Sequence, residues 1–263
     1  MTNEPRVFVH EDKAALVSDA AERFITRMVQ VIDEFEEANV ILTGGSVGIG
    51  VLAAINASPN RDRVRWDRVT FWWGDERWLP RADPERNELQ AREALIDHVQ
   101  VDPARVHAFA ASDDGITLDE AADRYARELA IAAPPNLPLP PFDLAFLGVG
   151  PDGHIASIFP NAAAVRERTK TVLAVRNSPK PPPERLTLTI PVINSAARVV
   201  IVLAGADKAS VLGLALAGAS ADEVPLAAIR ARRRTVINVD RDAAAQVPSN
   251  LIDPGEFWTS ADG

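Results

Sequence analysis

Continuous apolar runs constrain the fold of this chain more than any other feature of its sequence. Segments 198–204 (RVVIVLA) and 143–149 (DLAFLGV) carry apolar side chains at successive positions, not at alternate ones. Such strands are apolar on both faces, which is typical of a parallel sheet that lies between two layers of helices. The runs therefore predict an α/β fold.

Longer stretches with helical periodicity separate the apolar runs. In segment 12–38, Phe24, Met28, Val31 and Phe35 recur on one face, and Asp12 precedes them as a candidate N-cap. The predicted helices are 12–38, 47–56, 84–99, 117–132 and 206–218, with a short closing helix after Asp240 as its cap. The predicted strands are 6–10, 40–43, 68–73, 143–149, 171–175, 185–190, 198–204 and 234–239. We expect a mostly parallel, Rossmann-like central sheet with right-handed crossovers and helices on both faces.

Two proline-rich segments, 134–141 and 179–183, interrupt this alternation. The first is either a domain boundary or a stiff loop within one domain. We favour the loop, because each half of the chain alone would supply too few strands for a stable sheet. The prediction is a single large domain over residues 1–263, with its motifs between about 6 and 258.

Composition and charge narrow the classes of partner. The chain contains no cysteine, which excludes disulfides and thiolate metal sites, and its net charge of −9 disfavours nucleic acid as a main ligand. The basic segment 230–234 is interpreted as a solvated surface. The N-terminal segment lacks the layout of a signal peptide, and no apolar run is long enough to span a bilayer. We expect a soluble, cytoplasmic protein without nucleic-acid or membrane partners.

A glycine-rich segment, 42–50 (LTGGSVGIG), follows a predicted strand and opens a predicted helix. Backbone N–H groups at Gly44, Gly45 and Ser46 would there face an anion at the helix N-terminus, or the segment is only a tight turn. It lacks the lysine of a Walker A loop and the spacing of a dinucleotide fingerprint, so a nicotinamide-dependent oxidoreductase is poorly supported.

Two further loops at strand ends carry charge. Segment 72–80 (WWGDERWLP) places Asp75 and Arg77 among aromatic neighbours, and segment 203–209 (LAGADKA) places Lys208 in the first turn of a helix. Each is either a contact to an anionic ligand or an ordinary surface charge. Because ligands of open α/β sheets bind beyond the carboxyl ends of the strands, we expect Arg77 and Lys208 to meet an anion.

The central strand 143–149 runs directly into a turn that holds Asp152 and His154 among three glycines. A neutral imidazole near pH 7 can take a proton from water, and an aspartate two residues earlier can orient it. His10, His98 and His107 have no comparable surroundings and are interpreted as structural or solvated. One histidine with nearby aspartates does not make a recognisable metal-ligand set, so no metal is expected.

With these segments assembled, the chain resembles the 6-phosphogluconolactonases of the glucosamine-6-phosphate isomerase/deaminase superfamily. The resemblance extends over about residues 6–258 and rests on TGGS, GDERWLP, LGVGPDGHIASIFP, PKPPPERLTLTIPVIN and LAGADKA, in this order. It implies hydrolysis of 6-phospho-D-glucono-1,5-lactone in the oxidative pentose phosphate pathway, without metal or organic cofactor. It also implies a catalytic His154 and phosphate or sugar contacts at Gly44, Gly45, Ser46, Arg77, Lys208, Lys180 and Arg185.

The residues after His154 separate two branches of this superfamily. The deaminases carry a glutamate soon after the histidine, in a pattern like H-I-A-F-N-E, whereas this chain has HIASIFP, the form found in lactonases. One departure concerns the glycine segment, where many relatives continue with Ser/Thr-Pro and this chain has Val47-Gly48. Phosphate contact would then depend on backbone N–H groups and Ser46.

The expected mechanism uses His154 as general base for a water that attacks C1, with either Asp152 or Asp75 orienting the imidazole. Arg77 and Lys208 would hold the phosphate. The alternatives are a sugar-phosphate isomerase or deaminase on the same scaffold and a non-catalytic sugar-phosphate sensor. For assembly, the expectation is a monomer or a weak homo-oligomer.

Overall fold

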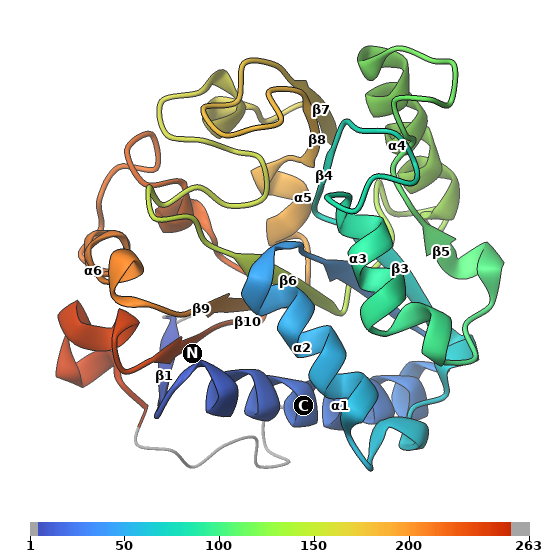
Figure 1. Cartoon of the computed structure of the whole chain (residues 1–263). Coiled ribbons are helices and arrows are strands. Elements are labelled where there is room, and N and C mark those ends of the chain that lie inside the picture. Colours follow the sequence, from blue (N-terminus) through green and yellow to red (C-terminus); the bar gives the residue numbers. More distant parts are fainter. Residues whose placement is uncertain (1–4, 254–263) are drawn as a thin grey trace.

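A seven-stranded sheet forms the centre of the computed structural model, which describes residues 5–253 (Figure 1). The strand order is β1-β10-β9-β6-β2-β3-β5, and every neighbouring pair is parallel. The strands are β1 (Arg6–His10), β2 (Ala38–Leu42), β3 (Val69–Trp73), β5 (Val106–His107), β6 (Leu144–Gly148), β9 (Arg198–Leu203) and β10 (Arg234–Asp240). The predicted α/β fold with a mostly parallel sheet is confirmed. The stretch 254–258 of the predicted motif-bearing core lies outside the described residues.

Helices cover both faces of this sheet. They are α1 (Lys13–Phe35), α2 (Gly45–Ala57), α3 (Asn87–Ala94), α4 (Leu118–Ala132), α5 (Ile190–Asn194) and α6 (Ala209–Leu216). In Figure 1, α1 lies below the sheet, and α4 and α5 lie above it. On one face Phe24 of α1 packs on Phe146, with ring centroids 5.6 Å apart; on the other, Trp72 meets Tyr125 of α4 at 5.8 Å. The predicted two-sided burial of the strands follows from these contacts.

A second, antiparallel sheet corrects the sequence-based assignment. It consists of β4 (Asp75–Arg77), β8 (Arg185–Leu188) and β7 (Val172–Val175), in that order. Segments 171–175 and 185–190 do form strands, but in this small sheet and not in the parallel one. β4 was predicted as a loop, because its three charged residues show no apolar alternation. The predicted strand 185–190 ends at Leu188, since α5 starts at Ile190 with a proline in its first turn.

Several predicted helices are shorter than their periodicity indicated. α1 starts after its N-cap Asp12 but ends at Phe35, because Glu36 takes a left-handed conformation with φ of 67°. The predicted helix 84–99 is α3 followed by a 3-10 turn at Ile96–His98, and helix 206–218 is a 3-10 turn at Ala206–Lys208 followed by α6. Asp240 ends β10, and its carboxylate accepts the N–H of Ala243 in the 3-10 helix Ala243–Gln246, which a second 3-10 helix, Ser249–Leu251, follows.

The direction of the crossovers reverses between β2 and β6. From β2 the chain moves to its neighbour β3, whereas from β6 it moves to β9 on the other side. The loops after β2 and β6 therefore diverge and leave a crevice at the carboxyl edge, where ligands of such sheets bind. Here the N–H of Gly148 lies 3.3 Å from Thr43 Oγ1 and joins the two strand ends. Among residues 5–253, no helix has the length and apolar character needed to cross a membrane.

Candidate active site

A cavity of about 190 Å³ lies at this crevice. Its wall comes from the ends of β2, β6 and β9 and from the β4–β8 pair. Eight of the ten predicted site residues line it: Gly44, Gly45, Ser46, Asp75, Arg77, His154, Arg185 and Lys208. The other two, Asp152 and Lys180, lie directly behind His154. Four segments at strand ends were singled out in the sequence: 42–50, 72–80, 203–209 and the turn after 143–149. They meet at this cavity.

His154 and Asp152 form a pair in the turn after β6. The Nδ1 of His154 is 2.5 Å from Asp152 Oδ1, and the imidazole is mostly buried. The turn is closed by the N–H of Gly150, which donates to the carbonyl of His154, and Gly153 has φ of 81°. A carboxylate at Nδ1 favours the tautomer with its proton there. Nε2, without a hydrogen-bond partner in the described part of the chain, then carries a free lone pair.

The ionisation of this pair follows from burial and from Lys180. Burial lowers the pKa of His154 below its ordinary value of 6.5, Asp152 opposes this, and Lys180 adds to it. Burial raises the pKa of Asp152, but the hydrogen bond of His154 and the positive charge of Lys180 act against it, and the net pKa is lowered. Lys180 Nζ lies 3.4 Å from both Asp152 Oδ1 and His154 Nδ1. At neutral pH the pair is therefore a carboxylate beside a neutral imidazole.

Arg185 fastens the segment that carries Lys180. Its guanidinium donates to the carbonyls of Pro181 at 2.8 Å and Pro182 at 3.1 Å, and it lies 3.3 Å from the carbonyl of Lys180. The same group stacks over the ring of Phe159. Because these carbonyls occupy most of its donors, Arg185 holds the loop at the cavity wall as well as adding positive charge to it.

Asp75 does not contact the imidazole. Its Oδ2 accepts from Ser157 Oγ at 2.7 Å, and its Oδ1 is 3.4 Å from Asn87 Nδ2. The sequence left open whether Asp75 or Asp152 orients His154, and the geometry places Asp152 there. Asn87 lines the cavity and was missed, because the sequence offered it only as one polar residue in a predicted helix. Ser157 lies in the motif LGVGPDGHIASIFP, but no role was assigned to it from the sequence.

Positive charge surrounds the glycine segment. Arg77 lines the cavity and donates to the carbonyl of Glu85 at 2.5 Å, while Lys208 pairs with Asp207 at 2.6 Å. Lys13, which the sequence did not single out, donates to Ser46 Oγ at 3.1 Å. The arrangement suits an anionic group at the N-terminus of α2.

Backbone space explains the glycines at the start of α2. Gly45 has φ of 82°, a left-handed conformation that favours glycine, although a Cβ there would meet nothing within 4 Å. At Gly48 a Cβ would lie 2.7 Å from Thr43 Cγ2. Glycine at 48 therefore lets α2 approach the end of β2 closely, which gives Val47-Gly48 a packing reason.

Comparison with known proteins gives a consistent assignment. The family model described as glucosamine-6-phosphate isomerases/6-phosphogluconolactonase matches residues 11–237. A 6-phosphogluconolactonase from Streptomyces coelicolor is 48% identical over 258 residues, which cover 97% of this chain and 99% of the relative.

Solved structures agree with the fold. A 6-phosphogluconolactonase from Thermotoga maritima is 26% identical, covers 90% of this chain and 100% of its own, and superposes with a TM-score of 0.79. One from Trypanosoma brucei reaches a TM-score of 0.81 at 24% identity, over 94% of this chain and 100% of its own. At 24% identity, the likeness to the Trypanosoma brucei structure shows the fold alone.

Proposed function

Because the chain belongs to the glucosamine-6-phosphate isomerase/6-phosphogluconolactonase family, we propose that it hydrolyses 6-phospho-D-glucono-1,5-lactone to 6-phosphogluconate with His154 as general base. The relative with 48% identity bears the name of this activity over nearly the whole chain. The observation that carries the mechanism is the His154–Asp152 pair at 2.5 Å, with the imidazole in the cavity wall. The reaction belongs to the oxidative pentose phosphate pathway.

The proposed chemistry needs one proton acceptor and one oxyanion site. Nε2 of His154 takes a proton from water as the water oxygen bonds to C1 of the lactone. Backbone N–H groups of the glycine turns stabilise the tetrahedral oxyanion. When the bond from C1 to the ring oxygen breaks, protonated His154 returns the proton to that oxygen. Asp152 holds the imidazole in the required tautomer throughout.

The phosphate lies at the other end of the cavity in this proposal. Lys208, Arg77, Ser46 and the N-terminus of α2 supply positive charge and donors there. Binding energy from this remote group fixes the carbonyl against the base, which is how positioning raises the rate. That no metal or cofactor takes part stays a prediction.

The test is turnover of enzymatically generated lactone, measured as proton release and corrected for spontaneous hydrolysis. We expect acceleration far above the spontaneous rate and no ammonia release from glucosamine 6-phosphate. Ammonia release would assign the chain to the deaminase branch. Binding of 6-phosphogluconate without any acceleration would identify a sensor instead.

Lys208→Ala is expected to raise KM by about 10-fold, because one charge-assisted contact to phosphate is lost, with a smaller loss of kcat. The matched control is Lys170→Ala, since Lys170 is exposed and lies outside the cavity. Steady-state kinetics of both variants give the comparison. An unchanged KM in Lys208→Ala would remove this residue from the phosphate site.

The pH dependence of kcat/KM should follow the titration of His154, because only its neutral imidazole can act as the base. A general base must be unprotonated, so kcat/KM falls as pH drops through the pKa of His154, which burial places below 6.5. We expect a flat profile from pH 7 to 8 and an acid limb with its midpoint below 6.5. Initial rates between pH 4.5 and 8, corrected for spontaneous hydrolysis, measure it. An acid-limb midpoint above 7 would contradict the assignment.

A further inference from the structure

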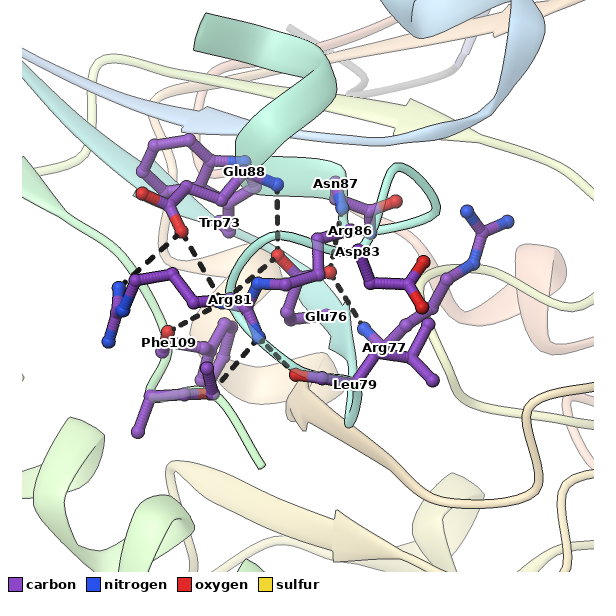
Figure 2. Close-up of polar contacts among 12 residues, drawn as sticks. Trp73, Glu76, Arg77, Leu79, Arg81, Asp83, Arg86, Asn87, Glu88 and Phe109 are labelled. Atoms are coloured by element: carbon purple, nitrogen blue, oxygen red, sulfur yellow. Dashed lines mark hydrogen bonds and ion pairs between the residues drawn. The ribbon is translucent and has the colours of Figure 1, made fainter. Parts of the chain in front are cut away.

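A cluster of buried charges behind Arg77 has no part in the proposed chemistry. Glu76 and Arg86 are each 0% exposed and Glu88 is 6% exposed, between β4 and the start of α3 (Figure 2). Burying charged groups this deeply costs free energy unless each is paired and hydrogen-bonded. The contacts that compensate for burial therefore show what the cluster holds together.

The carboxylate of Glu76 accepts three backbone N–H groups. Oε1 accepts from Arg77 at 2.8 Å and from Asn87 at 2.7 Å, and Oε2 accepts from Glu88 at 2.9 Å. Since α3 begins at Asn87, two of these donors belong to its first turn, where no carbonyl of the helix can reach them. One side chain thus joins strand β4 to helix α3.

Arg86 supports the ionised form of Glu76. Its NH2 group lies 3.6 Å from Glu76 Oε2 and 3.4 Å from Glu88 Oε2, and it donates to the carbonyl of Phe109 at 2.9 Å. Burial raises the pKa of Glu76 to about 7, against the opposing effects of Arg86 and the three N–H groups. The NH1 group of the guanidinium donates to the carbonyls of Leu79 and Ala110, and the buried Nε has no hydrogen-bond partner in the described part of the chain.

Arg77 and Asn87, whose backbone N–H groups donate to Glu76 Oε1, both line the cavity. Asn87 also donates through Nδ2 to the carbonyl of Asp75 at 3.0 Å. Its side chain packs so closely on Gly44 that a Cβ there would lie 2.0 Å from Asn87 Oδ1. Displacement of α3 from β4 would therefore shift Asn87 relative to Arg77, and would change its packing on the glycine segment.

We infer that Glu76 is a positioning residue for the sugar-phosphate site: its carboxylate fixes Arg77 and Asn87 relative to each other, and through Asn87 the glycine segment. This inference rests on the proposed function for its substrate. Glu76 itself reaches no reacting atom, and so it acts on binding through the residues it holds.

Glu76→Gln replaces one acceptor oxygen by an NH2 group that faces N–H donors. We expect KM for the lactone to rise by about 10-fold and kcat to change by less than about 3-fold. The matched control is Glu88→Gln, which removes a charge from the same cluster but from a carboxylate whose polar contacts within residues 5–253 are all with arginines. We expect it to lower Tm with KM unchanged. Equal KM values in the two variants would overturn the inference.

Glu76→Asp covers the case in which Glu76→Gln does not fold. It keeps the charge beside Arg86 but shortens the reach by one methylene, so β4 and α3 can no longer both be held. We expect KM to rise by about 3-fold or more, and an unchanged KM would refute positioning. If the wild-type chain does not accelerate lactone hydrolysis, the proposed function fails by itself. The side-chain NMR signals of Asn87 and Arg77 then decide: the inference requires that they shift in Glu76→Asp or Glu76→Gln but not in Glu88→Gln.

Discussion

His154→Ala is expected to lower kcat for lactone hydrolysis by about 10²–10⁴-fold, the usual contribution of general base catalysis. The imidazole contacts Asp152, Phe159 and Lys180. The proposed phosphate contacts, Lys208, Arg77 and Ser46, come from other loops. Substrate capture therefore persists, and KM should change little. Stopped-flow measurement of proton release, corrected for spontaneous hydrolysis, gives both constants.

His98→Ala serves as the control for this substitution. His98 is exposed, and its ring Nε2 is hydrogen-bonded to the carbonyl of Glu93. It should retain wild-type kinetics. Near wild-type turnover in His154→Ala would mean that the base is another group, and the proposed mechanism would fall.

Gly150→Ala is expected to reduce kcat nearly as much as loss of the histidine, about 10²-fold. A Cβ on residue 150 would lie 2.0 Å from both Cε1 and Nδ1 of His154 and 2.6 Å from Asp152 Oδ1. No backbone restriction is involved, since residue 150 does not have a positive φ. The methyl group must therefore push the imidazole out of its place beside Asp152. Crystallography of the variant and its steady-state kinetics test this together.

Gly50→Ala is the matched glycine control. A Cβ there meets only Val17, at 3.4 and 3.7 Å, which are ordinary contacts, and the residue lies within α2. We expect unchanged kinetics and a slightly higher Tm, because alanine favours a helix over glycine. If Gly150→Ala kept wild-type kcat, the close packing of residue 150 on the imidazole would be irrelevant to turnover.

The convergence of the four loops was predictable because it follows from the parallel sheet. Once 198–204 and 143–149 were identified as strands buried on both faces, their carboxyl ends had to lie along one edge. His154, Arg77 and Lys208 each follow such a strand, so their meeting needs no side-chain detail. The glycine segment after β2 could be placed by the same reasoning.

The remaining features depend on contacts between distant segments. β4 pairs with β8, more than 100 residues away. Its two buried acids, Asp75 and Glu76, have partners from other segments: Ser157 and Asn87 contact Asp75, and Arg86 contacts Glu76. No local pattern encodes those partners. Likewise, the spacing of Asp152 and His154 allowed a hydrogen bond, but Asp75 remained equally eligible until its own partners were known.

The β4–β8 pairing places Arg77 directly opposite Arg185, while Glu76 points away from the cavity into the charge cluster. Successive side chains of a strand alternate between its two sides. A single inserted or deleted residue within this three-residue segment would exchange the two sides, turning Glu76 toward the cavity and Arg77 toward the buried charge cluster. The register of this segment against β8 therefore sets which of its charges line the cavity.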